Sequence, residues 1–422
     1  MAKFTLRGVG VAWLAVVAIG LLASESVAAQ PVGTVATVDG APFSANLLGI
    51  DADWNVRLRS DSGERRVAAA DLAFWGAEVE SDRGPLLILA DGGRLAVDQI
   101  LALAGDRIAV ESNLWGRVMI PLELVRGVVF HPPAAFDERD KLEGAIASST
   151  GEQDVVLLEN GDRVEGFLRA PAPLVGPQPN APDALSKITL EVKGRDVDIP
   201  LKTITALIFN PALISPPRVV GMHARLGLDD GSLLLITAID PGPLTSITLP
   251  HGVRLSTDAE SLWEEVVFVR PATPRVVYLS DLRPIGYKHI PFLALDWPYH
   301  EDRNTLGGKL RVGRNLYSKG LGMHSASRLA YELRGDFQRF ETELALDAEA
   351  GRRGSVVARI FLDRGDGAWR AGYESPVLRG GEAPISVSLD VRGVQRLAIL
   401  VEFADRGDEC DYLDLLNARL LR

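Results

Sequence analysis

The sequence has 422 residues, of which 47% are hydrophobic, 24% charged and 6% aromatic, and its formal net charge is −11. This length allows about two to four domains of about 100–200 residues, and the apolar fraction excludes an intrinsically disordered chain. The acidic balance argues against a nucleic-acid partner, because phosphate binding requires clustered Lys and Arg. The single cysteine, Cys410, excludes a disulfide framework within the chain and indicates a buried free thiol.

The N-terminus has the pattern of a secretory signal. Lys3 and Arg7 are followed by an uncharged apolar run from Val9 to Ala23 and by small residues ending at Ala29. This pattern predicts a cleaved signal peptide over 1–29. An uncleaved anchor is the alternative, but the run is shorter than the roughly 20 residues that a spanning helix needs. We therefore expect an exported protein of the periplasm, cell envelope or extracellular space, without a transmembrane anchor after cleavage.

The next part of the chain repeats itself. Ile120-Pro121-Leu122 leads to Val128-Val129-Phe130, and Ile199-Pro200-Leu201 leads to Leu207-Ile208-Phe209 at the same spacing. An apolar run ending in Asp91-Gly92 or Asn160-Gly161 precedes each copy, and such dipeptides favour hairpin turns. Weaker copies flank this pair.

The repeats predict four β-rich units at 33–80, 84–133, 153–212 and 220–271, two on each side of a helical linker at 134–152. A unit of about 50 residues with tight turns is typical of a small SH3- or Sm-like β-barrel. Because each unit would bury little surface alone, we expect neighbours to stack or to pair their edge strands. No catalytic grouping is evident in any unit.

Beyond residue 275, short apolar segments alternate with turns rich in Gly and Asp, without a helix pattern. The expected strands are 277–279, 330–333, 340–346, 355–362, 369–375, 385–391, 397–403 and 415–421. They predict a jelly-roll β-sandwich over 275–422. The predicted fold class is therefore all-β, with tandem small barrels followed by this sandwich.

One motif in this region is specific. The run Tyr317-Ser318-Lys319-Gly320-Leu321-Gly322-Met323-His324-Ser325 contains the pattern K-G-[IL]-G-x-H-[AS], and Asp405, Asp411, Asp414 and Ala418 follow near the end. In this order the motifs resemble the NPCBM family of carbohydrate-binding modules over 277–422. With the preceding repeats, the chain is also similar to a class of exported proteins of planctomycete-like bacteria.

The resemblance implies a galactose-binding-like sandwich, usually non-catalytic and often attached to secreted enzymes or envelope proteins. The sequence departs from the family at two positions. Leu415 stands where relatives tend to carry Trp, and Asn417 stands where they carry Asp.

A glycan site needs an aromatic face for the sugar ring and polar groups for its hydroxyls. Residues in and near the motif that could supply these groups are His324, Ser325, Trp369, Arg370 and Tyr373. For His324 the alternative is a buried structural role, and for Trp369 it is an aromatic residue of an edge-strand core.

The segment from Glu402 to Asp414 contains six acidic residues and one basic residue, Arg406. Carboxylates and loop carbonyls are the ligands that Ca²⁺ prefers, and sandwiches of this type often hold a structural calcium. The candidate metal ligands are Asp405, Asp408, Glu409 and Asp411. A solvated acidic loop is the alternative.

Several enzyme signatures are missing from the sequence: it has no G-x-S-x-G, H-E-x-x-H or Walker motif. The leading hypothesis is an exported, non-catalytic protein whose sandwich binds a glycan or polysaccharide. A structural or assembly protein of the envelope, with protein partners, is the alternative. An unrecognised hydrolase would require a cleft with two facing carboxylates.

Overall fold

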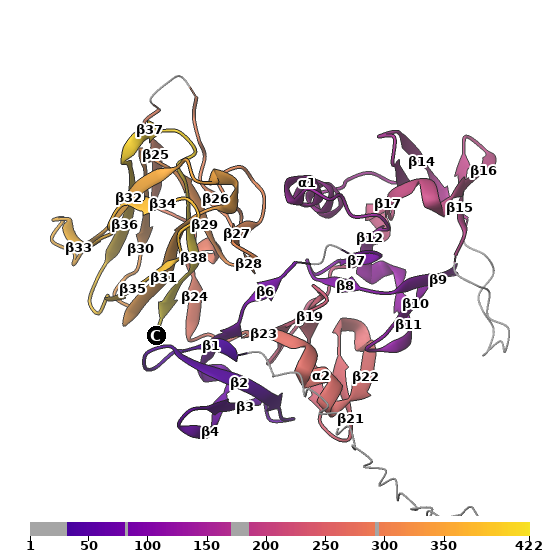
Figure 1. The fold of residues 1–422 in the computed structure, drawn as a ribbon, viewed down its shortest axis with the longest axis horizontal. Helices are drawn as coiled ribbons and strands as arrows, with labels where there is room; N and C mark the ends of the chain where they lie inside the picture. The colour runs from indigo at the N-terminus through magenta and orange to yellow at the C-terminus, as the bar shows by residue number, and fades with distance from the viewer. Residues whose placement is uncertain (1–31, 81–82, 170–184, 292–294) are drawn as a thin grey trace, which may run out of the picture. The chain divides into compact units, whose positions relative to one another are not determined.

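The computed structural model describes residues 32–80, 83–169, 185–291 and 295–422, so the predicted signal peptide lies outside the described residues. The described chain is built almost entirely of β-strands and has two short α-helices, α1 (Phe136–Ala147) and α2 (Ala259–Glu265) (Figure 1). Helix α1 lies in the segment predicted as a linker. No helix within the described ranges is long and apolar enough to cross a membrane.

The four predicted units share one strand plan, in which a last strand returns to pair with the first. Unit one contains β1 (Val32–Thr37), β2 (Phe43–Ile50), β3 (Asn55–Ser60), β4 (Gly63–Ala68), β5 (Leu72–Gly76) and β6 (Glu78–Val79). Unit two contains β7 (Leu86–Leu89), β8 (Arg94–Ala96), β9 (Gln99–Ala104), β10 (Arg107–Ser112), β11 (Gly116–Pro121) and β12 (Val125–Val129). Unit three contains β13 (Asp154–Leu158), β14 (Arg163–Leu168), β15 (Lys187–Val192), β16 (Arg195–Pro200) and β17 (Ile204–Ile208). Unit four contains β18 (Ala224–Leu228), β19 (Leu233–Ile236), β20 (Ala238–Asp240), β21 (Leu244–Thr248), β22 (Arg254–Asp258) and β23 (Val266–Pro271).

Edge pairing joins the units into one sheet of 16 strands, in the order β16-β15-β14-β13-β17-β12-β7-β8-β19-β18-β23-β5-β1-β2-β3-β4. The junctions are β12 with β17, β8 with β19, and β23 with β5. This order is linear, so the prediction of separate closed barrels is not confirmed. The pairing removes edges that small isolated units would leave open.

The repeated turn dipeptides have the backbone geometry that a tight hairpin requires. Gly40, Gly92, Gly161 and Gly231 adopt φ values of 92°, 80°, 87° and 87°. Only glycine adopts this region without a steric cost, which explains why the same dipeptide recurs in each unit.

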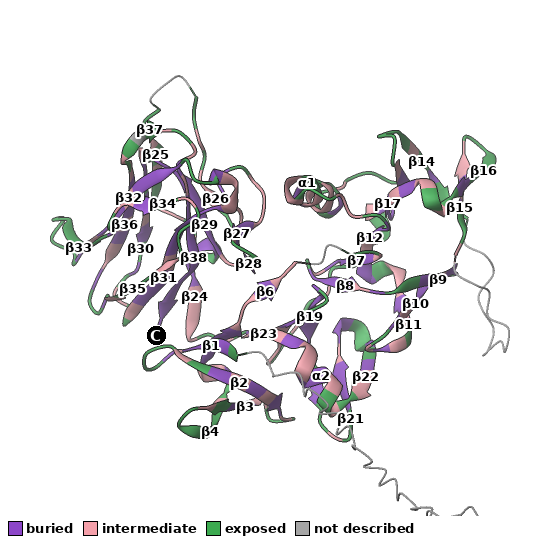
Figure 2. Ribbon diagram, in the orientation of Figure 1, coloured by how far each residue is buried: buried purple, intermediate pink, exposed green. Residues whose placement is uncertain are grey.

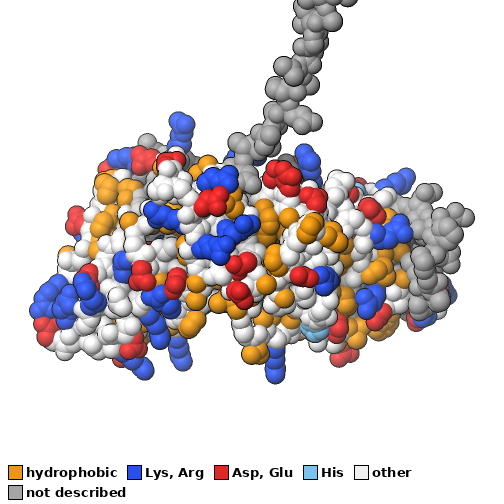
Figure 3. All heavy atoms as spheres, turned by 90° about the horizontal axis from the view of Figure 1, so that it is seen from below, with side chains coloured by type: hydrophobic (Ala, Val, Ile, Leu, Met, Phe, Trp, Pro, Cys, Tyr) orange, Lys and Arg blue, Asp and Glu red, His pale blue; other side chains and the backbone are white. Residues whose placement is uncertain are grey.

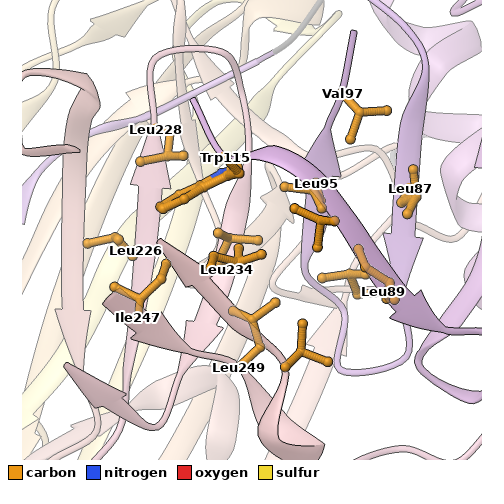
Figure 4. Packing of buried hydrophobic residues seen from close by; sticks show 14 of the residues in the cluster. Leu87, Leu89, Leu95, Val97, Trp115, Leu226, Leu228, Leu234, Ile247 and Leu249 are labelled. Carbon is orange, nitrogen blue, oxygen red and sulfur yellow. The ribbon is translucent and has the colours of Figure 1, made fainter. Parts of the chain in front are cut away.

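The units also share one hydrophobic core. Leucine side chains of β7 and β8 pack with apolar side chains of unit four around the Trp115 ring (Figure 4). Trp115 is 6% exposed and Leu234 0%. Burial between units therefore compensates for the small core that each unit would have alone.

The C-terminal part forms two six-stranded sheets. One contains β24 (Val276–Tyr278), β26 (His300–Glu301), β29 (Gly320–His324), β31 (Arg339–Leu346), β35 (Ile385–Asp390) and β38 (Tyr412–Leu421). The other contains β25 (Gly286–His289), β30 (Ser327–Glu332), β32 (Ser355–Asp363), β33 (Arg370–Glu374), β34 (Leu378–Arg379) and β36 (Arg396–Phe403). Strand β37 (Asp405–Asp408) follows β36. The β-sandwich prediction is confirmed, and its strands are mostly buried, with exposed residues at the loops and at β33 (Figure 2).

A three-stranded sheet connects the sandwich to unit one: β6 pairs with β28 (Asn315–Tyr317), which pairs with β27 (Leu310–Val312). Beside it, Arg311 donates hydrogen bonds to both carboxylate oxygens of Asp140 on α1, each at 3.2 Å, and to Glu80 at 2.9 Å. The Arg311 guanidinium also lies 4.5 Å from the centre of the Phe136 ring. Arg311 and Asp140 are each 4% exposed. Although burial opposes it, the hydrogen bond from Arg139 and the nearby cationic charges lower the pKa of Glu80.

We expect Arg311→Met to lower the free energy of unfolding by about 3 kcal/mol, because it leaves Asp140 buried without its main partner. Urea unfolding followed by tryptophan fluorescence measures this loss. Arg370→Met is the matched control, because the Arg370–Asp366 pair is exposed and exposed pairs contribute less than about 1 kcal/mol. Equal losses in the two variants would contradict a structural role for the buried network.

Candidate functional site

His324 ends β29 and lies within a group of aromatic rings at one end of the sandwich. Its ring stacks on the Trp297 ring at 4.7 Å and 2° between planes, and it meets the His289 ring edge-on at 5.9 Å. The Tyr412 ring lies 5.9 Å from both His324 and Trp297. We call His289, Trp297, His324 and Tyr412 the aromatic cluster. His324 is 2% exposed and the His289 side chain 5%, whereas Trp297 and Tyr412 are partly exposed.

Hydrogen bonds fix the loop that carries Trp297. The Tyr287 hydroxyl donates to the Trp297 carbonyl, and the Trp297 backbone N–H donates to His289 Nδ1 at 3.2 Å. The Tyr287 hydroxyl also lies 3.1 Å from Ser327 Oγ, and the Tyr287 ring lies 5.0 Å from the Tyr299 ring. The Trp297 backbone is therefore held by two side chains of β25, and the indole stacks on His324 of β29.

Hydrogen bonds fix which ring nitrogen donates and which accepts in the two histidines of the cluster. Burial, followed by the neighbouring His289, lowers the pKa of His324, against a hydrogen bond to the Ser325 carbonyl. Because a carbonyl can only accept, His324 Nδ1 donates at 3.3 Å, which makes Nε2 the acceptor nitrogen of the neutral ring. His289 Nδ1 accepts from Trp297, so its proton is on Nε2. The partly exposed rings of the cluster are therefore those of Trp297 and Tyr412, and the His324 ring lies buried against the indole.

Three other predicted glycan-site residues lie around β33. Trp369 is 41% exposed, and the Arg396 guanidinium lies 5.2 Å from its ring centre. Arg370 forms an exposed ion pair with Asp366. Tyr373 is partly buried against the edge of the sandwich core.

The predicted glycan residues fall into two groups. Ser355, at the start of β32, is held by Asp411 near the aromatic cluster, whereas Asp363, at the end of β32, pairs with Arg396 beside Trp369. Nine residues of extended strand span roughly 26 Å between these ends. His324 and Ser325 therefore do not share one depression with Trp369 and Arg370. Trp297 was not among the residues that the sequence predicted for the site.

The predicted metal ligands are held by other partners. Asp405 pairs with Arg379, and Glu409 lies 3.2 Å from Arg353. Asp411 is 0% exposed and accepts the Ser355 backbone N–H at 2.8 Å. Among the residues that the structure describes, no three His, Cys, Asp or Glu side chains gather closely enough to hold a metal. The four predicted ligands therefore do not form a cation-binding group in the described chain. Calcium at the acidic run stays a prediction.

The two departures from the family pattern have different surroundings. Leu415 is 0% exposed in the sandwich core, so a Trp at this position would face the core rather than a sugar. Asn417 is 6% exposed, has a φ of 49°, and its backbone N–H donates to the Lys319 carbonyl at 2.9 Å. Asparagine tolerates this left-handed backbone better than most residues.

The repeat region contains a polar cavity of about 680 Å³ lined by several acidic side chains: Glu80, Asp98, Asp229, Asp230, Asp258 and Glu265. A hydrogen bond with Asp229, together with burial, raises the pKa of Glu265 to about 7. This pair lies within hydrogen-bonding distance, well below the separation of about 5 Å that glycoside hydrolysis requires. The pair therefore does not have the geometry of a glycosidase.

Charged side chains of both signs are interspersed on the face shown in Figure 3. Lys and Arg alternate there with Asp and Glu, between hydrophobic side chains.

The C-terminal part of the chain is thus a two-sheet sandwich with aromatic rings gathered at one end. Residues 275–421, about the C-terminal third of the chain, match the NPCBM/NEW2 domain model. This match confirms the family resemblance of the sequence.

Three known proteins are similar to parts of the chain. A protein of Renibacterium salmoninarum named "Putative endo-alpha-N-acetylgalactosaminidase" is 27% identical over 175 residues, which cover 41% of this chain and 11% of that protein. CBM51 from Clostridium perfringens GH95, solved in complex with methyl-galactose, is 22% identical with a TM-score of 0.30, covering 34% of this chain and 99% of that one. CBM51-2 and INT domains of Clostridium perfringens ZmpB, with GlcNAc, are 22% identical with a TM-score of 0.31, covering 42% and 36%. The chain thus spans about a tenth of the curated relative.

Burial raises the pKa of Asp411 to about 6, against the hydrogen bond from Ser355. A carboxyl group with a raised pKa in the folded state costs stability as the pH rises from about 4 to about 6, because the folded state then binds more protons than the unfolded state. Asp411→Asn keeps an acceptor for Ser355 and should remove this loss. Relative to wild type, we expect it to gain about 2 kcal/mol between pH 4 and pH 7.

Urea unfolding at these two pH values measures the difference. Asp405→Asn, in the same segment but exposed, is the control and should follow the wild-type profile. An Asp411→Asn profile parallel to that of wild type would contradict the buried, protonated carboxyl.

Proposed function

We propose that this protein is an exported, non-catalytic glycan-binding protein that acts at the cell envelope or on extracellular polysaccharide. The observation that carries this proposal is the aromatic cluster at one end of an NPCBM/NEW2 domain. In it the partly exposed Trp297 ring stacks on the buried His324 ring, and the partly exposed Tyr412 ring lies beside both. An indole can stack on the apolar face of a sugar, and a tyrosine hydroxyl can exchange hydrogen bonds with the sugar hydroxyls.

The aromatic cluster is a better candidate than the surface around Trp369. Trp297 is fixed by the Tyr287 and His289 hydrogen bonds, so stacking on it costs little conformational entropy. The Trp369 ring already has the Arg396 guanidinium over it, and Arg370 is engaged by Asp366. We therefore assign His324 to the glycan site together with Trp297 and Tyr412, and treat Trp369, Arg370 and Tyr373 as a separate surface.

The repeat region supports an alternative role in envelope assembly. Strands β16 and β4 end the 16-stranded sheet, and Phe167 and Val197 are 48% and 39% exposed close to the β16 end. Open strand edges with exposed apolar side chains are sites where another protein can add a strand. In this role both halves of the chain would contact protein partners.

We expect the full-length chain to bind glycans on an array, with galactose and GlcNAc as the first soluble competitors. Trp297→Ala should weaken binding about tenfold or more, because it removes the stacking surface. Trp369→Ala is the matched control and should change the affinity less than about twofold.

Circular dichroism confirms that both variants fold. Loss of binding in Trp369→Ala alone would move the site to β33. Absence of binding by the wild-type chain to every envelope and plant polysaccharide would favour the assembly role.

A further inference from the structure

An open groove of about 430 Å³ lies in the repeat region, between β11 of unit two and β22 of unit four (Figure 1). Residues 117–119 of β11 line one side, and residues 253–256, at the start of β22, line the other. Successive side chains of a strand point to opposite faces of its sheet, so a groove over a face would be lined by every second residue. Because the lining residues are consecutive on both strands, the strand edges form the walls of this groove.

Both walls are free strand edges. Strand β11 ends the three-stranded sheet β11-β10-β9, and β22 ends the sheet β20-β21-β22. Within the described chain, β11 pairs with β10 alone and β22 with β21 alone. Along such an edge, backbone N–H and C=O groups point outward without a partner strand, and these are the groups that bind an added strand.

Exposed polar and buried apolar side chains alternate along both walls. In β11, Arg117 is exposed and Val118 is 8% exposed; in β22, Arg254 is exposed and Leu255 is 1% exposed. Val118 and Leu255 belong to the core that the repeat units share. The groove therefore has an apolar inner side and an outer side that carries arginines.

The titratable side chains that line the groove are all basic: Arg107, Arg117, Arg254 and His251. This lining differs in sign from the chain as a whole, whose net charge is −11. Arg117 lies 3.7 Å from Glu111, and Arg254 lies 2.6 Å from Asp240, and all four side chains are exposed. Exposed ion pairs are weak, so both guanidinium groups can exchange their partners for carboxylates of a ligand.

These features together select the chemistry of the occupant. Two free edges fit an extended peptide, and the basic lining fits an acidic one. A peptide that alternates apolar and acidic residues would place its apolar side chains beside Val118 and Leu255, and its carboxylates beside Arg117 and Arg254. A sugar chain fits less well, because the tryptophan in the lining, Trp115, is only 6% exposed and offers no face for stacking.

We propose that the groove between β11 and β22 binds an extended acidic segment of a partner protein as an added strand. The added strand would connect the three-stranded sheets of units two and four. This surface is separate from the aromatic cluster, and it does not depend on glycan binding.

Fluorescence anisotropy with the full-length protein and a labelled peptide of about eight residues tests the proposal. Valine and glutamate alternate in this peptide, and a second peptide carries lysine in place of glutamate. We expect the glutamate peptide to bind about tenfold more tightly than the lysine peptide, or better, because the groove is basic. Methylation of alternate backbone nitrogens of the glutamate peptide should weaken its binding about tenfold, because it removes hydrogen bonds to the strand edges.

Arg254→Glu should weaken binding of the glutamate peptide about tenfold or more. Arg59→Glu is the matched control, because the Arg59 side chain also forms an ion pair and is 59% exposed, against 57% for Arg254. Both variants have the same net charge, and the control should change the affinity less than about twofold. Hydrogen exchange should become slower in β11 and β22 when the peptide is bound, which a purely electrostatic contact would not cause.

The outcomes separate the alternatives. If circular dichroism shows that Arg254→Glu does not fold, Arg117→Glu replaces it with the same expected loss. No binding of the glutamate peptide, equal losses in Arg254→Glu and Arg59→Glu, or protection only outside β11 and β22 would overturn the proposal. Binding of polygalacturonate that requires Arg254, without binding of the peptide, would overturn it in favour of an acidic polysaccharide.

Discussion

The buried ion pair between Arg311 and Asp140 is the interaction on which the arrangement of the described chain depends most. It connects β27 with α1, which lies between the second and third repeat units. Glu80, at the end of unit one, accepts a hydrogen bond from the same arginine. Each of these groups would be costly to bury alone, so the three segments are stable only together. Pairing of β6 with β28 supplies backbone hydrogen bonds at the same place. Residues far apart in sequence thereby act as one structural unit.

The two ends of the sandwich differ in how their loops are held. At one end, Asp411 fixes the start of β32, and the aromatic cluster is formed by residues of β25, β29, β38 and the loop before β26. At the other end, Asp363 and Arg396 close the turn beneath Trp369. A binding surface keeps its geometry only when rigid strands support it. The end that carries the aromatic cluster, where hydrogen bonds hold the loop backbone, meets this condition better than the exposed β33 hairpin.

Much of the fold could be predicted because its signals are local. Asp-Gly and Asn-Gly turns mark the hairpins, and apolar segments after residue 330 correspond closely to β30, β31, β32, β35, β36 and β38. The short strands β26, β27 and β28 were not predicted, because strands of two or three residues carry no periodicity and form only by pairing with distant segments. Separate barrels were expected because sequence repeats reveal the unit but not which edges meet.

The sequence by itself determined the class of the chain: β-rich repeats, then a jelly-roll with the motif around His324, since turn chemistry, alternation and motif order are properties of neighbouring residues. Only the tertiary structure decided which side chains work together. His324 contacts Trp297 rather than Trp369, because the loop that carries Trp297 packs against the end of β29. Trp369 lies near the opposite end of the sandwich, about the length of β32 away. Residues of β11 and β22 line one groove because units two and four pair through β8 and β19, a contact that sequence spacing does not encode.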